Sequence, residues 1–189
     1  MTVVNVEDKI KITDGKDTLN IDGTKKGAVT ITTEHDMVHD GVMYHTDHVY
    51  DEVADTASVA MMFVTRENEP HMKMGIGSEA KARYLFYEDC TCATVNLGTI
   101  VSIENFNRTK NKITVASAFW KGTQMNAASM GTELHHGTIY GSTSKQQNIG
   151  GGVRDGVEWI LKKNTQYCVK VVNLGGEAKD VGIHFEYYE

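Results

Sequence analysis

Apolar and polar residues alternate along much of the chain with a period of two, which is the period of a half-buried β-strand. The clearest case is the last segment, in which Val181, Ile183, Phe185 and Tyr187 occupy alternate positions. Residues 58–65 are apolar on both faces, as in a strand covered on both sides. Further strands are expected at 82–88, 112–120, 157–161 and 165–174, with weaker ones at 42–49, 71–76, 99–105 and 133–140.

The segments between these strands set the fold class. Gly175-Gly176 begins a turn, which predicts a hairpin between the last two strands. Residues 141–156 are rich in Gly and Ser and are expected to form one long flexible loop. Helix periodicity with capping residues is not evident, so little helix is expected. Many short strands separated by turns predict an all-β protein, a β-sandwich or jelly roll.

Residues 1–35 differ from the rest of the chain in composition and pattern. They are polar, and their alternating pieces are short: Val4 to Val6, Ile10 to Ile12 and Val29 to Ile31. We interpret them as an extended N-terminal arm or small hairpin that a partner orders, ahead of a jelly-roll-like sandwich at 36–189.

Charge and composition narrow the class of partner. The net charge of the 189 residues is −6, and the longest basic runs are Lys25-Lys26 and Lys162-Lys163. Nucleic-acid binding needs a basic stripe, so no nucleic-acid partner is expected. The sequence has neither a signal-peptide pattern at its start nor an apolar run long enough to span a membrane. Three cysteines, an odd number, favour a reducing compartment.

Eight histidines raise the question of a metal. His35 and His39 would share a face only on a helix, whereas Gly41 and the alternation after it favour loop and strand. On a strand, His45 and His48 point to opposite faces and cannot share an ion. A cupin-like metal site therefore remains an alternative, and the expected role of these histidines, with the pair His135-His136, is polar surface or interface.

The other candidate motifs also have structural interpretations. Cys90-x-Cys92 lacks the spacing and second pair of a zinc or redox site, and Cys168 lies within an apolar strand as a buried thiol does. Gly150-Gly151-Gly152 lacks the lysine and helix of a phosphate-binding loop. Asn107-Arg108-Thr109 fits a glycosylation sequon, which matters only in a secreted protein. The sequence therefore predicts no catalytic, cofactor-binding or metal-binding residue, and no enzyme.

The C-terminal third carries a family resemblance. The residues that carry it are Glu158-Trp159-Ile160-Leu161-Lys162-x-Asn164-Thr165-x-Tyr167, Val171-x-Asn173-Leu174, Phe185-Glu186-Tyr187-Tyr188-Glu189 and, upstream, His39-Asp40-Gly41-x-Met43-Tyr44. Over roughly residues 35–189 the chain resembles a group of tailed-bacteriophage virion proteins. One departure is Lys163, where these proteins often have proline.

The resemblance implies a capsid auxiliary protein, a decoration or cement protein that is made in the host cytoplasm and binds the outside of the head. Its expected partners are the major capsid protein and copies of itself, most often as a homotrimer, with no membrane partner. Two alternatives stay open: a tail or head-fibre module that binds host carbohydrate, and a small cupin-like metalloenzyme.

Overall fold

The protein is described by a computed structural model that covers residues 2–6, 9–13, 18–22, 27–30, 33–91, 98–110, 117–122, 130–141, 151–154 and 158–189. These residues form sixteen strands and one helix, which confirms the all-β prediction. In the described part of the chain, no helix is long and apolar enough to cross a membrane.

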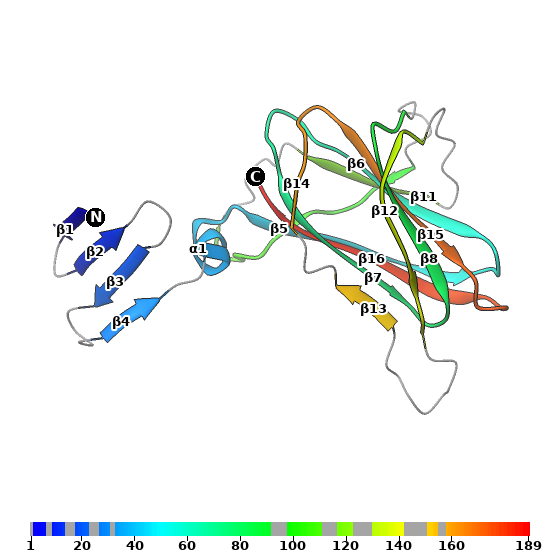
Figure 1. The fold of residues 1–189 in the computed structure, drawn as a ribbon, viewed down its shortest axis with the longest axis horizontal. Helices are drawn as coiled ribbons and strands as arrows, with labels where there is room; N and C mark the ends of the chain where they lie inside the picture. The colour runs from blue at the N-terminus through cyan, green and yellow to red at the C-terminus, as the bar shows by residue number, and fades with distance from the viewer. Residues whose placement is uncertain are drawn as a thin grey trace.

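Two six-stranded antiparallel sheets face each other as a β-sandwich (Figure 1). Sheet I has the order β10 (Glu104–Asn105), β5 (Met43–Val53), β16 (Lys179–Tyr188), β7 (His71–Ser78) and β13 (Gly151–Arg154), and β14 (Trp159–Ile160) also pairs with β7. Sheet II has the order β12 (Thr132–Ile139), β8 (Ala82–Glu88), β15 (Gln166–Asn173), β6 (Ser58–Val64), β11 (Ala118–Gly122) and β9 (Thr99–Ile100). The predicted sandwich is confirmed.

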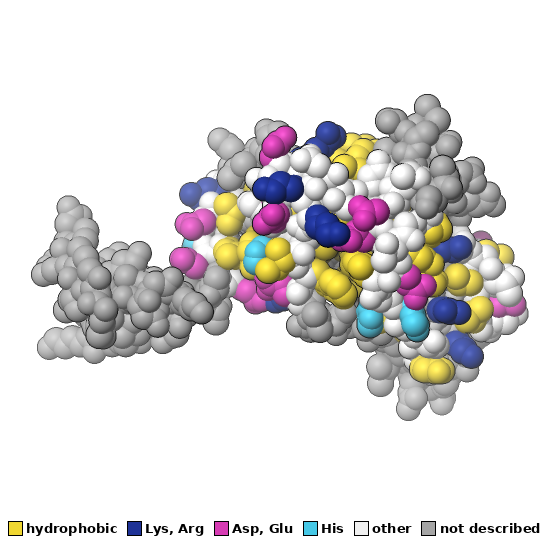
Figure 2. Space-filling model, turned by 45° about the horizontal axis from the view of Figure 1, so that its top comes forward, with side chains coloured by type: hydrophobic (Ala, Val, Ile, Leu, Met, Phe, Trp, Pro, Cys, Tyr) yellow, Lys and Arg dark blue, Asp and Glu magenta, His cyan; other side chains and the backbone are white. Residues whose placement is uncertain are grey.

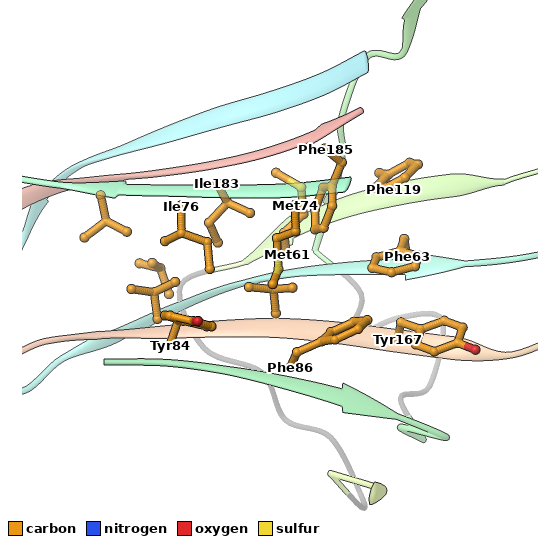
Figure 3. Packing of buried hydrophobic residues seen from close by; sticks show 14 of the residues in the cluster. Met61, Phe63, Met74, Ile76, Tyr84, Phe86, Phe119, Tyr167, Ile183 and Phe185 are labelled. Atoms are coloured by element: carbon orange, nitrogen blue, oxygen red, sulfur yellow. The ribbon is translucent and has the colours of Figure 1, made fainter. Parts of the chain in front are cut away.

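Aromatic side chains hold the two sheets together. Phe63 of β6 is fully buried, and its ring centre lies 5.2 Å from the ring centres of Phe119 and Tyr167 in the same sheet. It also lies 5.2 Å from the ring of Phe185, which comes from β16 in the opposite sheet. Figure 3 shows these side chains meeting between the layers. Burial of such large rings is the main favourable contribution to the stability of the sandwich.

The period of two predicted from the sequence decides which side chains enter this core. Along β7 and β16 every second residue is buried, including Met72, Met74, Ile183 and Phe185. The residues between them face outward. β6 is buried on both faces from Val59 to Phe63, because it lies in the middle of sheet II and its outer face carries a second apolar cluster around Met62.

The predicted hairpin between the last two strands is wrong. β15 pairs with β6 and β8 in sheet II, whereas β16 pairs with β5 and β7 in sheet I. The turn at Gly175-Gly176 therefore passes from one sheet to the other. The buried Asn173 amide shapes it, donating to the carbonyls of Val53 and Glu177 and accepting from the Gly175 N–H.

Three other segments differ from their prediction. Residues 151–154, expected to lie in a loop, form β13 against β7, since backbone pairing with an edge needs no apolar pattern. The expected strand at 99–105 is two short strands, β9 in sheet II and β10 in sheet I. Of the expected strand at 112–120, residues 112–116 lie outside the described residues, as does Val157 of the strand expected at 157–161.

The N-terminal residues form more than a single hairpin. β1 (Thr2–Val6), β2 (Lys9–Thr13), β3 (Thr18–Asp22) and β4 (Gly27–Thr30) pair in sequence order as an antiparallel sheet. Their described pairings are all with one another. The proposed boundary at 35/36 falls inside α1 (Thr33–Asp40), a helix that the sequence did not predict.

Gly41 explains why this helix was missed. It adopts a φ of +77°, and its N–H, like that of Val42, bonds to the Met37 carbonyl. A glycine with positive φ just after the last turn is a common helix terminator. Gly41 thus ends the helix, whereas we expected it to indicate a loop.

The aromatic core gives a stability prediction. Phe63→Ala should lower the free energy of unfolding by about 3–5 kcal/mol, because it leaves a cavity among rings from both sheets. Urea denaturation followed by circular dichroism measures this loss. Ile160→Ala is the control, since Ile160 is 65% exposed and its loss should cost no more than about 0.5 kcal/mol. Equal effects of the two substitutions would contradict the assigned core.

Candidate functional site

The outer face of sheet I gathers titratable side chains from strands far apart in the sequence. Asp47 of β5 lies directly opposite His184 of β16, and His45 lies opposite Glu186. On its other side His45 pairs with Glu104 of β10. All five residues face away from the core because they alternate with buried positions. The outer face of sheet I is therefore our candidate site.

His45 has neighbours on several sides. Its Nδ1 lies 4.0 Å from Oδ1 of Asp47, and its ring centre lies 4.9 Å from that of Phe106 and 6.3 Å from that of His184. Glu104 in turn accepts a hydrogen bond from Arg108 at 2.6 Å. The histidine is thus held between acidic groups and one aromatic ring.

His184 lies beside Glu186 of its own strand and opposite Gly75 of β7. Its Nε2 lies 3.1 Å from Oε1 of Glu186, and a Cβ added to Gly75 would lie 3.5 Å from its ring. One ligand atom from each of His45, Asp47 and His184 lies within 4.8 Å of the other two. Two imidazoles and a carboxylate are a donor set that suits zinc and similar cations.

A second cluster lies on the same face, at the C-terminal end of β16. The Tyr188 hydroxyl donates to Oε1 of Glu158 at 2.7 Å and lies 2.8 Å from Nδ1 of His71, which also contacts Glu158. The hydrogen bond from Tyr188, followed by that from His71, lowers the pKa of Glu158. Burial and the neighbouring carboxylate raise the pKa of Tyr188 to about 12. Near neutral pH the cluster therefore holds an ionised carboxylate beside a neutral phenol.

The predicted separation of His45 and His48 agrees with the pairing. His48 lies opposite the buried Ile183, on the core side of β5, and its Nδ1 lies 3.3 Å from the Lys121 ammonium. Burial, followed by that lysine, lowers the pKa of His48. His135 and His136, on β12 of sheet II, contact Tyr84 at 3.0 Å and Glu133 at 2.6 Å.

The loop predicted around His35 and His39 is wrong. Both residues lie on α1, and their Nε2 atoms are 2.9 Å apart. Both are exposed. The helix is tied to sheet I because Glu34 pairs with Lys73 of β7 and the Asn107 amide donates to the His39 carbonyl.

Cys90 and Cys168 are both buried free thiols, as expected for Cys168, and Cys92 lies outside the described residues. A hydrogen bond with Cys168 lowers the pKa of Cys90, whose thiol donates to the Met130 carbonyl at 3.2 Å. In the sequon, Oδ1 of Asn107 accepts from the N–H and hydroxyl of Thr109 within a surface turn. Of the glycine run, Gly151 and Gly152 lie in β13, and Gly150 is outside the described residues.

The surface is hollowed where β5 leads into β6. A hollow of about 790 Å³ is lined by residues 48–54 and 56–60 together with Met130 and Lys170. Its charged side chains include Asp51 and Glu52. The hollow has the volume of a small-molecule site, and none of His45, Asp47 and His184 lines it.

The sequence analysis missed three residues of the candidate site, which are Asp47, Glu104 and His184. We used only the apolar positions of the last segment, Val181 to Tyr187. The positions between them, which hold His184, Glu186 and Tyr188, form the opposite face of the same strand. The alternation predicts that these polar residues share one face of the strand. Only the pairing of β16 with β5 shows that this face lies beside His45 and Asp47.

The Tyr188 cluster gives a prediction on pH dependence. The folded-state pKa of Glu158 lies below its ordinary value of 4.5, so its carboxylate stabilises the fold above that value. This contribution is lost as the pH falls through the folded-state pKa. Tyr188→Phe removes the largest cause, so the pKa of Glu158 should move up toward 4.5.

An NMR titration of the Glu158 carboxyl carbon in both proteins measures this change. Tyr140→Phe is the control, since Tyr140 is 74% exposed, and it should leave the Glu158 titration unchanged. A Glu158 titration that Tyr188→Phe does not shift would contradict the assigned hydrogen bond.

The comparisons with known proteins identify no relative of this chain. No protein-family model, no curated protein and no solved structure matches the chain.

Proposed function

We propose that the protein is a structural component of a tailed-phage virion, a decoration or cement protein that binds the outside of the head and stabilises the shell. The sequence resemblance over residues 35–189 suggests this class. The physical support comes from the N-terminal sheet and from the outer surfaces of the sandwich.

The N-terminal sheet is the observation that carries the proposal. Its register pairs Val3 with Ile12, Ile12 with Leu19, and Ile10 with Ile21, so one set of alternating positions is mostly apolar. A single sheet of four short strands needs a second layer to cover such positions. A shell or a neighbouring subunit would supply that layer.

The sandwich offers further surface for contacts with neighbours. The strand order of sheet II ends at β12, eight residues long, and a long end strand is a common place for another chain to add a strand. On the face in Figure 2, acidic, basic and hydrophobic side chains are interspersed. Such a mixed surface is compatible with protein contacts, because interfaces are about as apolar as the rest of a protein surface.

Binding by several linked subunits at once would strengthen such contacts. We propose that the protein acts as a homotrimer, since symmetric association covers apolar surface and matches the local symmetry of a shell. Each subunit then adds its own modest contact, and the joint affinity exceeds that of a single subunit.

A module that binds host carbohydrate is the second candidate. The hollow beside β5 and β6 supports it, because Asp51, Glu52 and Lys170 offer polar groups for sugar hydroxyls. The cupin-like enzyme has less support. The aromatic core fills the inside of the sandwich in the described residues, and the histidine cluster lies on its outer face.

The proposal predicts that the apolar set of the N-terminal sheet carries the binding to the shell. Ile12→Asp should weaken binding to undecorated shells, assembled from the major capsid protein of the same genome, by at least about tenfold, since it places a charge in a contact that excludes water. Co-sedimentation with the shells measures the affinity.

Asn20→Asp is the matched control, because it introduces the same side chain at the alternate set of positions, and it should change the affinity by less than about twofold. Light scattering should give the mass of a trimer for both proteins. Absence of binding by the unmodified protein, together with a monomer mass, would overturn the proposal. Binding to sugars on a glycan array would then favour the second candidate.

A further inference from the structure

We infer that His45, Asp47 and His184 form a transition-metal site on the outer face of sheet I, with zinc as its fitting ion. This inference goes beyond the capsid proposal and stands independently of it. It revises the expectation from the sequence that no residue binds a metal, which rested on His45 and His48 pointing to opposite faces of a strand.

The antiparallel register builds the site. Asp47 and His184 lie directly opposite each other, and His45 lies two positions from Asp47 on the same face of β5. Directly opposite positions, such as those of Asp47 and His184, have Cβ atoms about 5 Å apart, and diagonal positions, such as those of His45 and His184, lie about 7–8 Å apart, which long side chains still bridge. The backbone of two paired strands therefore fixes all three ligands.

The distances allow coordination with small side-chain adjustments. The three ligand atoms lie within 4.8 Å of one another, and Nδ1 of His45 lies 4.0 Å from Oδ1 of Asp47. Ligands around a tetrahedral zinc at about 2.1 Å are about 3.4 Å apart. Rotations within the side chains of His45 and Asp47 close this difference, since 32% and 60% of their side-chain surfaces are exposed.

Surrounding groups orient the two imidazoles. Glu186 lies 3.1 Å from Nε2 of His184, a position from which its carboxylate either orients the ring or becomes a fourth ligand. The ring of Phe106 packs beside His45, and Gly75 leaves space beside the ring of His184. These contacts limit the positions of both rings before any ion binds, which lowers the entropic cost of binding.

Charge also favours a cation at this place. Asp47, Glu186 and Glu104 surround the two histidines, and Glu104 pairs with His45 from β10. On this face Arg108 is bound to Glu104, and Lys73, which lies directly opposite Glu186, is bound to Glu34. A divalent ion would offset the excess of negative charge and would link β5 to β16.

Other histidine clusters fit an ion less well. His35 and His39 supply two ligands from one exposed helix. His71 is already engaged by Glu158 and Tyr188. The cluster of His45, Asp47 and His184 is the group of three that the described residues bring together.

Isothermal titration of the chelator-treated, full-length protein with zinc chloride tests the inference. We expect saturable binding of one zinc ion per chain and a rise in Tm of at least about 3 °C at saturating zinc, because the ion binds only the folded state. EDTA should reverse both effects.

Two variants locate the ion. His184→Ala and Asp47→Asn should each weaken zinc binding by at least about tenfold. Asp47→Asn keeps the size of an exposed side chain, so it remains informative if His184→Ala does not fold. The matched control is His136→Ala, an exposed histidine beside Glu133 on sheet II, which should change the affinity by less than about twofold.

The outcomes separate the possibilities. Unmodified protein that shows no saturable zinc binding would overturn the site. Zinc binding that Asp47→Asn leaves unchanged would also overturn it. If His35→Ala abolishes the binding instead, the ion lies on α1 and the assignment to sheet I is wrong.

Discussion

Packing of aromatic rings between the two sheets is the interaction on which the rest of the structure depends. Phe63 of sheet II touches Phe185 of sheet I and also the rings of Phe119 and Tyr167 beside it. Once these rings are buried, the alternation of each strand decides which residues face outward. The outer face of sheet I, with its histidines and carboxylates, is thus a consequence of how the core is filled.

The need to bury apolar side chains also distinguishes the sandwich from the N-terminal sheet. The sandwich covers its own apolar residues, so its surfaces are available for contacts. In the N-terminal sheet, one set of alternating positions is mostly apolar. Because this sheet is a single layer, that set needs cover from elsewhere. We propose that the sandwich is the stable body and that the N-terminal sheet binds the partner.

Local patterns in the sequence predicted much of the fold but little of the candidate site. The strands around Phe86 and Phe185 follow from alternation, whereas the strand around Phe63 follows from a run that is apolar on both faces. The hairpin at Gly175-Gly176 was wrong because a turn residue shows that the chain reverses, but does not show which sheet receives the next strand. His45 and His184 meet only through pairing between distant segments, and that pairing depends on tertiary packing.

Hydrogen–deuterium exchange, with and without shells, tests the central claim most directly. Binding to shells should increase protection of the amides in residues 2–30, while the amides of β6 and β15 should be strongly protected in both states. If residues 2–30 are as protected before binding as after it, or if new protection appears only in the sandwich, the N-terminal sheet does not bind the partner and the account is contradicted.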